Sequence, residues 1–510
     1  MRVIWKAFII GFLVVNSGFG IWLFFKLESQ SFDTVRKSFI HKEVNMTDIK
    51  NSQAWEEYMV YNRFDQDHEN VVDDKDYCVL VKEYRAQHKP LLDYRGMPLP
   101  MERLIFSDYM PGNLVKDVIN NYATLVYKYH YLDVSADFPK EKIPYYVNMF
   151  FHKTPYWHYY HELGTEFLCP GQMYNHIPGH EHMINKDDSA KAARIYGKKY
   201  ENRKDCFYQW SFMPLTIDLS AEGECKLFFK HIEDRKFQGI EWIMKKSRNS
   251  HNGEGVILLT KSKLRGLKVM YKHGKKCGEI NDKFIVQKYI GNPLTVEGKK
   301  FDFRVYMLIA SVDPLIILYH DGFLRVSLTQ YDVSSEESGS HITNTHQALE
   351  FVKTLNTTED ERDEMMKEQM WSFEKFEDYM IKQGKVKMNW LNDYVRPLMK
   401  KKMYHLVQMH IPNLIKHPGV FEMYGLDYIF DDDLNLWLLE VNRSPAMQAT
   451  TEEKGKLQGT MIKDILDIEY AILYGIELDP IVENTTFNMI FDDRKHGMDK
   501  YYGLIDSECV

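Results

Sequence analysis

The chain has 510 residues, which is enough for two or three domains with a large buried core. Its composition, 44% hydrophobic and 27% charged, is that of a folded globular protein and excludes a disordered or fibrous chain. The net charge of −8 argues against a general nucleic-acid binder, which would be basic, so we expect no nucleic-acid partner.

An apolar run near the N-terminus predicts a membrane anchor. Residues 7–25, AFIIGFLVVNSGFGIWLFF, carry no charge over 19 residues, which is just long enough for a helix to cross a bilayer. A cleaved signal peptide is the alternative, but the small-x-small triplet 18–20 lies inside the run, and a buried helix is a third possibility. We expect residues 1–27 to form an uncleaved single-pass anchor. Basic residues on both sides leave its orientation open.

The rest of the chain divides into four predicted parts. Residues 28–75 are polar and charged and predict a linker or stalk. Residues 76–240 are rich in aromatic residues and predict an N-terminal domain with the first part of the catalytic domain. Residues 241–478 carry most of the motifs and predict the catalytic core, and residues 479–510 form a C-terminal tail.

Histidine and cysteine spacing gives little support to a metal site in residues 76–240. His176, His180 and His182 with Glu181 suggest zinc, but the H-x3-H-x-H spacing around Pro-Gly is typical of a loop, and we favour a solvated loop. The six cysteines are scattered without a C-x-x-C pair. This pattern fits a reducing compartment better than a disulfide-stapled domain, although the even count leaves disulfides open.

From residue 241 onward, short apolar strands alternate with polar loops, and helices follow them. The strands are WIMKK, VILLT, FIVQKYI, FDFRVYMLIAS and LIILYH. Apolar spacing near 3.6 predicts an amphipathic helix over 359–383, and further helices are expected over 393–408 and 454–474. This order predicts a mixed α/β (α+β) fold.

A predicted β-hairpin over residues 421–441 holds the most informative polar residues. Its two apolar strands flank the turn residues 431–433. Glu440 and Asn442 are two residues apart, so they share a face of one strand, and Asp427 can reach that face from the other strand. Oxygen ligands in this arrangement suit Mg²⁺, which is usually held by few protein groups plus nucleotide phosphates. The alternative is a strand end whose polar side chains face water.

Four other segments supply groups that a Mg–nucleotide site needs. Trp242–Leu259 is a strand, a glycine loop and a strand, so backbone N–H groups near Gly253 and Gly255 can approach phosphate oxygens beside Lys245. It lacks the G-x4-G-K-[ST] pattern, which disfavours a P-loop fold. The other segments are QKYIGNPL, the alternating strand KKFDFRVYML, and GFLRVS with the loop HITN. Each of them alone could be an ordinary strand or loop.

Together, these segments resemble the tubulin tyrosine ligase-like family, whose members have an ATP-grasp fold. The resemblance covers about residues 210–470 and includes FMPLTIDL upstream and GLDYIFDDDLNLWLLEVNRSP downstream. It implies that ATP and Mg²⁺ bind here. The implied metal ligands are Asp427, Glu440 and Asn442. The implied nucleotide-site residues are Lys245, Asn252, Gly253, Gly255, Gln287, Lys288, Tyr289, Ile290, Lys300, Asp302 and Asn344, with His341 and Thr343 beside them. Arg304 and Arg325 would act with Lys245 near the γ-phosphate and the substrate carboxylates.

The resemblance also implies the reaction. An acceptor carboxylate would attack the γ-phosphate of ATP to give an acyl phosphate, and a free amino acid would then form an amide. We expect a polyglutamylase that joins free L-glutamate to tubulin C-terminal tails. A glycylase, a tyrosine ligase or an inactive microtubule-binding protein are the alternatives. Two basic runs, one within 261–276 and one within 396–402, could meet acidic tails.

The side of the membrane on which the catalytic domain lies is a separate expectation. We expect it to be cytoplasmic and associated with microtubules. A lumenal ligase with another substrate is the alternative, and the glycosylation sequons at Asn45, Asn356, Asn442 and Asn484 bear on it.

Overall fold

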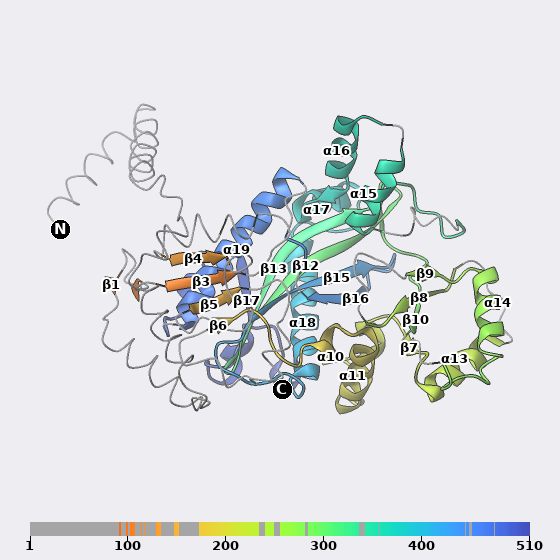
Figure 1. The fold of residues 1–510 in the computed structure, drawn as a ribbon, viewed down its shortest axis with the longest axis horizontal. Coiled ribbons are helices and arrows are strands. Elements are labelled where there is room, and N and C mark those ends of the chain that lie inside the picture. Colours follow the sequence, from red (N-terminus) through yellow and green to blue (C-terminus); the bar gives the residue numbers. More distant parts are fainter. Residues whose placement is uncertain are drawn as a thin grey trace, which may run out of the picture.

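The computed structural model describes residues 173–509, except 234–239, 249–255, 281–283, 336–340, 342, 356, 444, 448–450 and 474, and short segments between residues 91 and 151. These residues form a mixed α/β fold, as predicted (Figure 1). Among the helices described, none is both long enough and apolar enough to cross a membrane. The predicted anchor, residues 1–27 with the apolar run 7–25, lies outside the described residues.

A seven-stranded antiparallel sheet forms the centre of the fold. Its main path runs β14–β13–β12–β15–β16, with β11 paired to β12 and β17 paired to β13. The strands are β11 (Thr295–Val296), β12 (Lys299–Val312), β13 (Leu315–Val326), β14 (Met370–Trp371), β15 (Glu422–Phe430), β16 (Leu436–Arg443) and β17 (Phe487–Asp492). β15 and β16 form the hairpin predicted over residues 421–441.

Both faces of this sheet are covered, which explains why its strands are so apolar. Odd-numbered residues of β12 such as Phe303 and Val305 pack into one core cluster, and even-numbered residues such as Tyr306 and Leu308 pack into a second. The second cluster lies under α19 (Glu452–Leu473) and α20 (Asp479–Val482). The alternation matters for function, because Asp302 and Arg304 also have even numbers and therefore lie on the second face.

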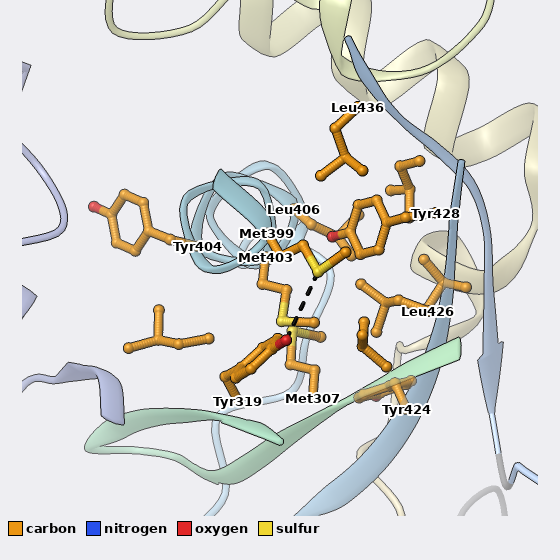
Figure 2. Close-up of a cluster of buried hydrophobic side chains, with 14 of the residues drawn as sticks. Met307, Tyr319, Met399, Met403, Tyr404, Leu406, Tyr424, Leu426, Tyr428 and Leu436 are labelled. Atoms are coloured by element: carbon orange, nitrogen blue, oxygen red, sulfur yellow. Dashed lines mark hydrogen bonds between the residues drawn. The ribbon is translucent and has the colours of Figure 1, made fainter. Parts of the chain in front are cut away.

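The first core cluster is built around α18 (Arg396–His410), which follows a π-helical turn, η4 (Leu391–Val395). In Figure 2, Met399 and Met403 of α18 point toward Met307 and Tyr319 of the sheet, and Tyr428 of β15 lies beside them. The hydroxyl of Tyr319 donates to the sulfur of Met399 across 3.7 Å. This packing fixes the central strands that carry the polar residues of the hairpin.

A smaller four-stranded sheet lies at one end of the molecule (Figure 1). It has the order β7–β10–β8–β9, with β7 (Thr216–Asp218), β8 (Trp242–Lys246), β9 (Ile257–Leu258) and β10 (Phe284–Lys288). Two helices, α13 (Glu222–Glu233) and α14 (Lys261–Met270), share an apolar cluster with this sheet. β8 and β9 are antiparallel, which confirms the predicted hairpin, although its glycine loop, residues 249–255, is outside the described residues.

The described N-terminal elements are short. β1 (Leu91–Leu92) pairs with β2 (Pro98–Leu99), and a parallel sheet has the order β4–β3–β5–β6. Its strands are β3 (Arg103–Ser107), β4 (Tyr129–Asp133), β5 (Val147–Phe151) and β6 (Met173–Tyr174). The helices α10 (Glu181–Ile184), α11 (Lys186–Lys199) and α12 (Gln209–Phe212) then lead to the small sheet.

The C-terminal residues belong to the main fold. β17 adds a strand to the central sheet, and the short helices η5 (Gly497–Tyr501) and η6 (Ser507–Cys509) follow it. Cys509 is disulfide-bonded to Cys206, and Cys225 is bonded to Cys277. The sequence favoured a reducing compartment over disulfides, and these pairings support the alternative that it left open.

The helix predicted over 359–383 is wrong in one respect. The structure has two helices there, α16 (Glu359–Glu368) and α17 (Phe373–Lys382), after α15 (Thr345–Thr354). Between them, β14 pairs with β13 and buries Trp371, and Ser372 caps α17 by accepting from the N–H of Lys375. Tertiary pairing therefore interrupts a continuous helical pattern. The predicted helices over 393–408 and 454–474 are confirmed as α18 and α19.

Candidate active site

The strand register brings the predicted acidic and basic residues into neighbouring positions. Arg304 of β12 lies directly opposite Asp427 of β15, and Asp427 lies directly opposite Glu440 of β16. On the other side of β12, Asp302 lies opposite Arg325 of β13. The predicted convergence of Asp427 with Glu440 is therefore confirmed as a register of adjacent strands.

Asp427 is the centre of a buried ion cluster. Arg304 donates to it with Nε at 2.5 Å and Nη2 at 3.1 Å, and Nη2 of Arg325 lies 2.8 Å from its Oδ2. Burial alone would raise the pKa of Asp427, but the two arginines outweigh burial and hold the pKa well below its usual range. Asp427 is therefore an ionised carboxylate.

Arg325 is shared between two carboxylates. It donates to Asp302 with Nε at 2.6 Å and with Nη2 at 2.7 Å. Burial lowers the pKa of Arg325, but Asp302 and Asp427 outweigh that effect and raise it. The hydroxyl of Thr343 also donates to Asp302, while Asn344 lies just before α15 and is half-buried. The loop predicted to border the site does reach it.

The three predicted metal ligands converge. The amide nitrogen of Asn442 lies 3.4 Å from Oδ2 of Asp427 and 3.4 Å from Oε1 of Glu440. A half-turn of that amide would present its oxygen at the same point, giving three oxygen donors of the kind that Mg²⁺ prefers. Oδ1 of Asp427 accepts one hydrogen bond from the described residues, which leaves it able to bind a cation. The residues present therefore fit a divalent cation.

Buried lysines face this acidic group. Lys245 on β8 donates to Oε1 of Gln287 at 2.9 Å, and Gln287 donates to the hydroxyl of Thr216 at 2.9 Å. Burial lowers the pKa of Lys245 to about 8, the charges of Glu440 and Asp427 oppose that shift, and Lys186 adds to it. The charges of Glu440 and Asp427 therefore act on Lys245, which is buried on the neighbouring small sheet.

Lys300 is held in an aromatic corner. Its amino group donates to the hydroxyl of Tyr289 at 3.1 Å and lies 4.6 Å from the centre of that ring. The same hydroxyl is 2.7 Å from Nδ1 of His341. Burial lowers the pKa of Lys300 to about 8, with Asp302 opposing the shift and Lys245 adding to it. The contact between Tyr289 and His341 thereby connects the strand end predicted to line the adenine pocket with the predicted loop that contains His341.

Lys288 is the predicted adenine-site residue whose side chain faces elsewhere. Its amino group is 2.7 Å from a carboxylate oxygen of Glu241 and 5.3 Å from the centre of the Trp242 ring. Its backbone N–H donates to the carbonyl of Leu215 at 2.8 Å. Ile290 follows the strand and is half-buried. The glycine-loop residues Asn252, Gly253 and Gly255 lie outside the described residues.

Two further lysines reach the site and were not identified from the sequence. Lys186, the first residue of α11, lies 3.5 Å from Oε2 of Glu440, and the next residue, Asp187, accepts from the hydroxyl of Ser247 at the end of β8. Lys454 is buried in the first turn of α19, and burial lowers its pKa to about 8 with help from Arg304 and Arg325. Acidic residues are favoured in the first turn of a helix, so a lysine at that position was the sequence feature that could have identified Lys454 as a site residue.

Two glycines set the position of Arg304. A Cβ on Gly322 would lie 1.8 Å from the backbone oxygen of Arg304, so only glycine allows the irregular pairing of β12 and β13 there. A Cβ on Gly425 would lie 3.0 Å from Cβ of Pro445 and 3.3 Å from Cδ of Arg304. Both glycines permit the close approach that brings Arg304 onto Asp427.

The prediction of a solvated histidine loop is wrong, and so is the zinc alternative. His176 and His180 are buried, and both contact the carboxylate of Glu422, the former at 3.0 Å. Burial raises the pKa of Glu422, but His180 and His176 outweigh it and the pKa is lowered. His182 is largely exposed and lies 3.5 Å from Asp188. Glu422 has an even number and Asp427 an odd one, so the histidine cluster lies on the opposite face of β15.

Of the two basic runs, one is on the surface. Lys261, Lys263 and Arg265 of α14 are exposed. In the second run, Arg396 is bound to Asp321, and Lys402 is buried and donates to the carbonyl of Ser211 at 2.7 Å. Arg396 and Lys402 therefore make contacts within the fold, while Lys400 and Lys401 of the same run are partly exposed.

Comparison with known proteins gives a family. The model of the tubulin-tyrosine ligase family matches residues 167–476. The inactive polyglycylase TTLL10 of Homo sapiens is 29% identical over 306 residues, which are 56% of this chain and 43% of that protein. The tubulin glycylase 3A of Drosophila melanogaster is 28% identical over 270 residues, 52% of this chain and 25% of that protein. The probable tubulin polyglutamylase TTLL2 of Mus musculus is 28% identical over 311 residues, 59% of this chain and 51% of that protein.

The chain thus spans about half, or less, of the length of these relatives. The matched region contains the small sheet, the central sheet down to β16, and all of α19. It also contains each residue of the ion cluster and each predicted metal ligand. Because the family match covers more than half of its 510 residues, the chain belongs to the tubulin-tyrosine ligase family.

Proposed function

We propose that the chain is an ATP-dependent ligase that joins the amino group of an amino acid to a side-chain carboxylate of an acceptor protein. The observation that carries the proposal is the convergence of Asp427, Glu440 and Asn442 on adjacent strands, and the charges of both carboxylates act on the buried Lys245. Members of this family are ATP-dependent ligases, which supports the reaction class.

The residues of this chain would hold Mg²⁺ and ATP as follows. Asp427, Glu440 and Asn442 would hold the metal through oxygen atoms. Lys245 and Lys300 would contact the phosphates, and the strand end at Gln287–Ile290 would line the adenine pocket. When bound, Mg²⁺ would neutralise charge on the phosphate oxygens during phosphoryl transfer.

Arg304 and Arg325 would place the reacting carboxylate. Their guanidinium groups are fixed by Asp427 and Asp302, so binding a ligand costs them little additional side-chain entropy. Nη1 of Arg304 makes no hydrogen bond to any residue in the described part of the chain, which leaves it for an acceptor or phosphate oxygen. The γ-phosphoryl group would pass to the acceptor carboxylate, and the incoming amino group would displace phosphate to form the amide.

For the substrates, we propose free L-glutamate and the glutamate side chains of tubulin C-terminal tails. Curated relatives include proteins named as probable tubulin polyglutamylases, and others named as glycylases, so glycine is the alternative. The exposed basic helix α14 has the charge that an acidic tail would meet. An inactive protein is a further alternative, since one relative is named an inactive polyglycylase.

The test is mass spectrometry of tubulin tails after incubation with the full chain, Mg–ATP and one amino acid at a time. We expect glutamate increments that depend on ATP. Increments of glycine alone would overturn the choice of amino acid, and unmodified tails from protein that binds Mg–ATP would overturn tubulin as the acceptor. A second acceptor class, an acidic segment of a protein in an oxidising compartment, is favoured by the two disulfides.

A further inference from the structure

The four described cysteines form two separate disulfide bonds, and no described cysteine is left free. Cys206 and Cys509 are 303 residues apart in the sequence, and Cys225 and Cys277 are 52 apart. All four residues are at most 7% exposed. Two independent, buried pairs at disulfide distance are typical of chains that fold where disulfides persist, and are rare in cytosolic proteins.

The first disulfide attaches the C-terminal end to the region between α11 and α12. The same junction is reinforced by Arg203, whose Nη1 donates to the carbonyl of Glu508 at 2.9 Å and whose Nη2 lies 3.0 Å from Asp205. The C-terminal helix η6 is therefore held beside Cys206 by polar contacts as well as by the covalent bond. The pairing is part of how this end of the chain packs.

The second disulfide lies inside the small sheet's apolar cluster. Cys225 on α13 is fully buried, and Cys277 follows the turn after α14. Gly274 and Gly278 in that turn have positive φ values of 88° and 87°, a conformation that glycine adopts without steric cost. The disulfide thereby fixes the basic helix α14 to its neighbour.

One sequon is on the surface and another is not. Asn484, of Asn-Thr-Thr, is exposed in the turn between α20 and β17, and its side chain donates to the carbonyl of Pro480 at 2.7 Å. Asn442, of Asn-Arg-Ser, faces Asp427 and Glu440, and Pro445 follows its sequon. Of the two sequons whose asparagine lies within the described residues, the accessible one, at Asn484, is therefore the one whose modification would leave the candidate active site intact.

We propose that this domain matures in the oxidising lumen of the secretory pathway, with Cys206–Cys509 and Cys225–Cys277 as structural disulfides and an N-linked glycan on Asn484. In each disulfide, two thiols lose two protons and two electrons to the disulfide of a protein thiol oxidant, which becomes a dithiol. For the glycan, the Asn484 amide nitrogen bonds to the anomeric carbon of a lipid-linked oligosaccharide. The carbon–oxygen bond to pyrophosphate breaks, and the amide loses a proton.

The proposal goes beyond the ligase activity and does not rest on it. Its consequence is a choice between the two acceptor classes of the proposed function: a domain that matures in the lumen would meet acidic segments of secretory proteins, whereas tubulin tails are the acceptor only for a domain that faces the cytoplasm. It takes the lumenal alternative to the cytoplasmic location expected from the sequence. The apolar run 7–25, acting either as an anchor or as a signal, would deliver the domain to that side of the membrane.

The disulfides are tested on the full chain, expressed with its own N-terminus in cultured insect or mammalian cells. Thiols are blocked with N-ethylmaleimide at lysis, and unreduced peptides are mapped by mass spectrometry. We expect two linked peptide pairs, one joining Cys206 to Cys509 and one joining Cys225 to Cys277. Alkylated peptides for all four cysteines would overturn the proposal.

The glycan is tested by a glycosidase-sensitive gel shift. We expect Asn484→Gln to lose one glycan relative to the wild type. Thr486→Ser is the matched control, because it keeps the sequon and the hydroxyl that donates to Asp464 at 2.5 Å, and it should keep the glycan. An Asn484→Gln shift equal to that of the wild type would overturn the glycan assignment. Stabilisation by Mg–ATP, measured on the same protein, separates a failure of this proposal from a failure of the ligase proposal.

Discussion

Glu440→Gln separates the proposed metal site from the stability of the fold. The Glu440 side chain is 28% exposed, and its one ion pair among the described residues, with Lys186, spans 3.5 Å. Loss of such a partly exposed pair costs about 0–1 kcal/mol, which corresponds to a Tm change of about 2–4 °C or less. The substitution removes the charge of a proposed metal ligand while keeping the size of the side chain.

The effect on ligand binding should be larger than the effect on stability. A ligand present at 100 times its Kd stabilises a protein by about 2.7 kcal/mol. We expect the wild type to gain about this much from Mg²⁺ with a non-hydrolysable ATP analogue, and Glu440→Gln to lose most of the gain. The measurement is thermal unfolding with and without the nucleotide, in Mg²⁺ and in EDTA.

Glu224→Gln is the matched control. Glu224 is similarly exposed, at 32%, and pairs from α13 with Arg194 of α11 at 2.5 Å. This variant should keep the full Mg–nucleotide stabilisation. If Glu440→Gln kept it as well, the assignment of Glu440 as a metal ligand would be refuted.

Three further predictions concern the same site. Asp427→Asn removes a buried charge that partners Arg304, and chemical denaturation should show a loss of about 3–5 kcal/mol; a loss below 1 kcal/mol would contradict the buried ion cluster. Gly425→Ala should displace Arg304 and reduce kcat, with a smaller effect on stability measured as Tm. Gly459→Ala, whose Cβ would make only ordinary contacts at 3.8 Å, should leave kcat unchanged. Nucleotide affinity measured by calorimetry should fall above about pH 8 as Lys245 and Lys300 lose their protons, and Lys245→Arg should weaken that dependence while Lys300 keeps the remainder; an unchanged profile in Lys245→Arg would exclude Lys245 as a titrating group. In the nucleotide-free protein the sign is opposite for stability, because the cost of burying a charged Lys245 is present below pH 8 and is relieved as the pH rises toward the unfolded pKa of about 10.4.

Local patterns in the sequence predicted the elements that depend on short-range chemistry. The hairpin over 421–441 was predictable because its two apolar runs, its turn residues and its polar positions all lie within one short segment. Arg304, the partner of Asp427, could be named as a candidate from the sequence because it is an arginine on the alternating strand KKFDFRVYML. That it lies opposite Asp427 is set by the pairing of β12 with β15, more than 100 residues apart.

Long-range pairing explains what the sequence did not predict. His176 and His180 are buried because Glu422, more than 240 residues away, accepts from both of them, and nothing near them in the sequence indicates this. Cys206 finds Cys509 across 303 residues, so cysteine spacing carried no signal. Lys186 reaches Glu440 only because α11 begins beside the end of β8.

The most direct test of the central claim is a crystal structure of the chain with Mg²⁺ and a non-hydrolysable ATP analogue. We expect the metal to lie about 2.0–2.1 Å from oxygen atoms of Asp427, Glu440 and Asn442, and to bridge to the phosphates beside Lys245. A nucleotide bound away from these strands, or a metal ion without contact to Glu440 and Asp427, would contradict the account.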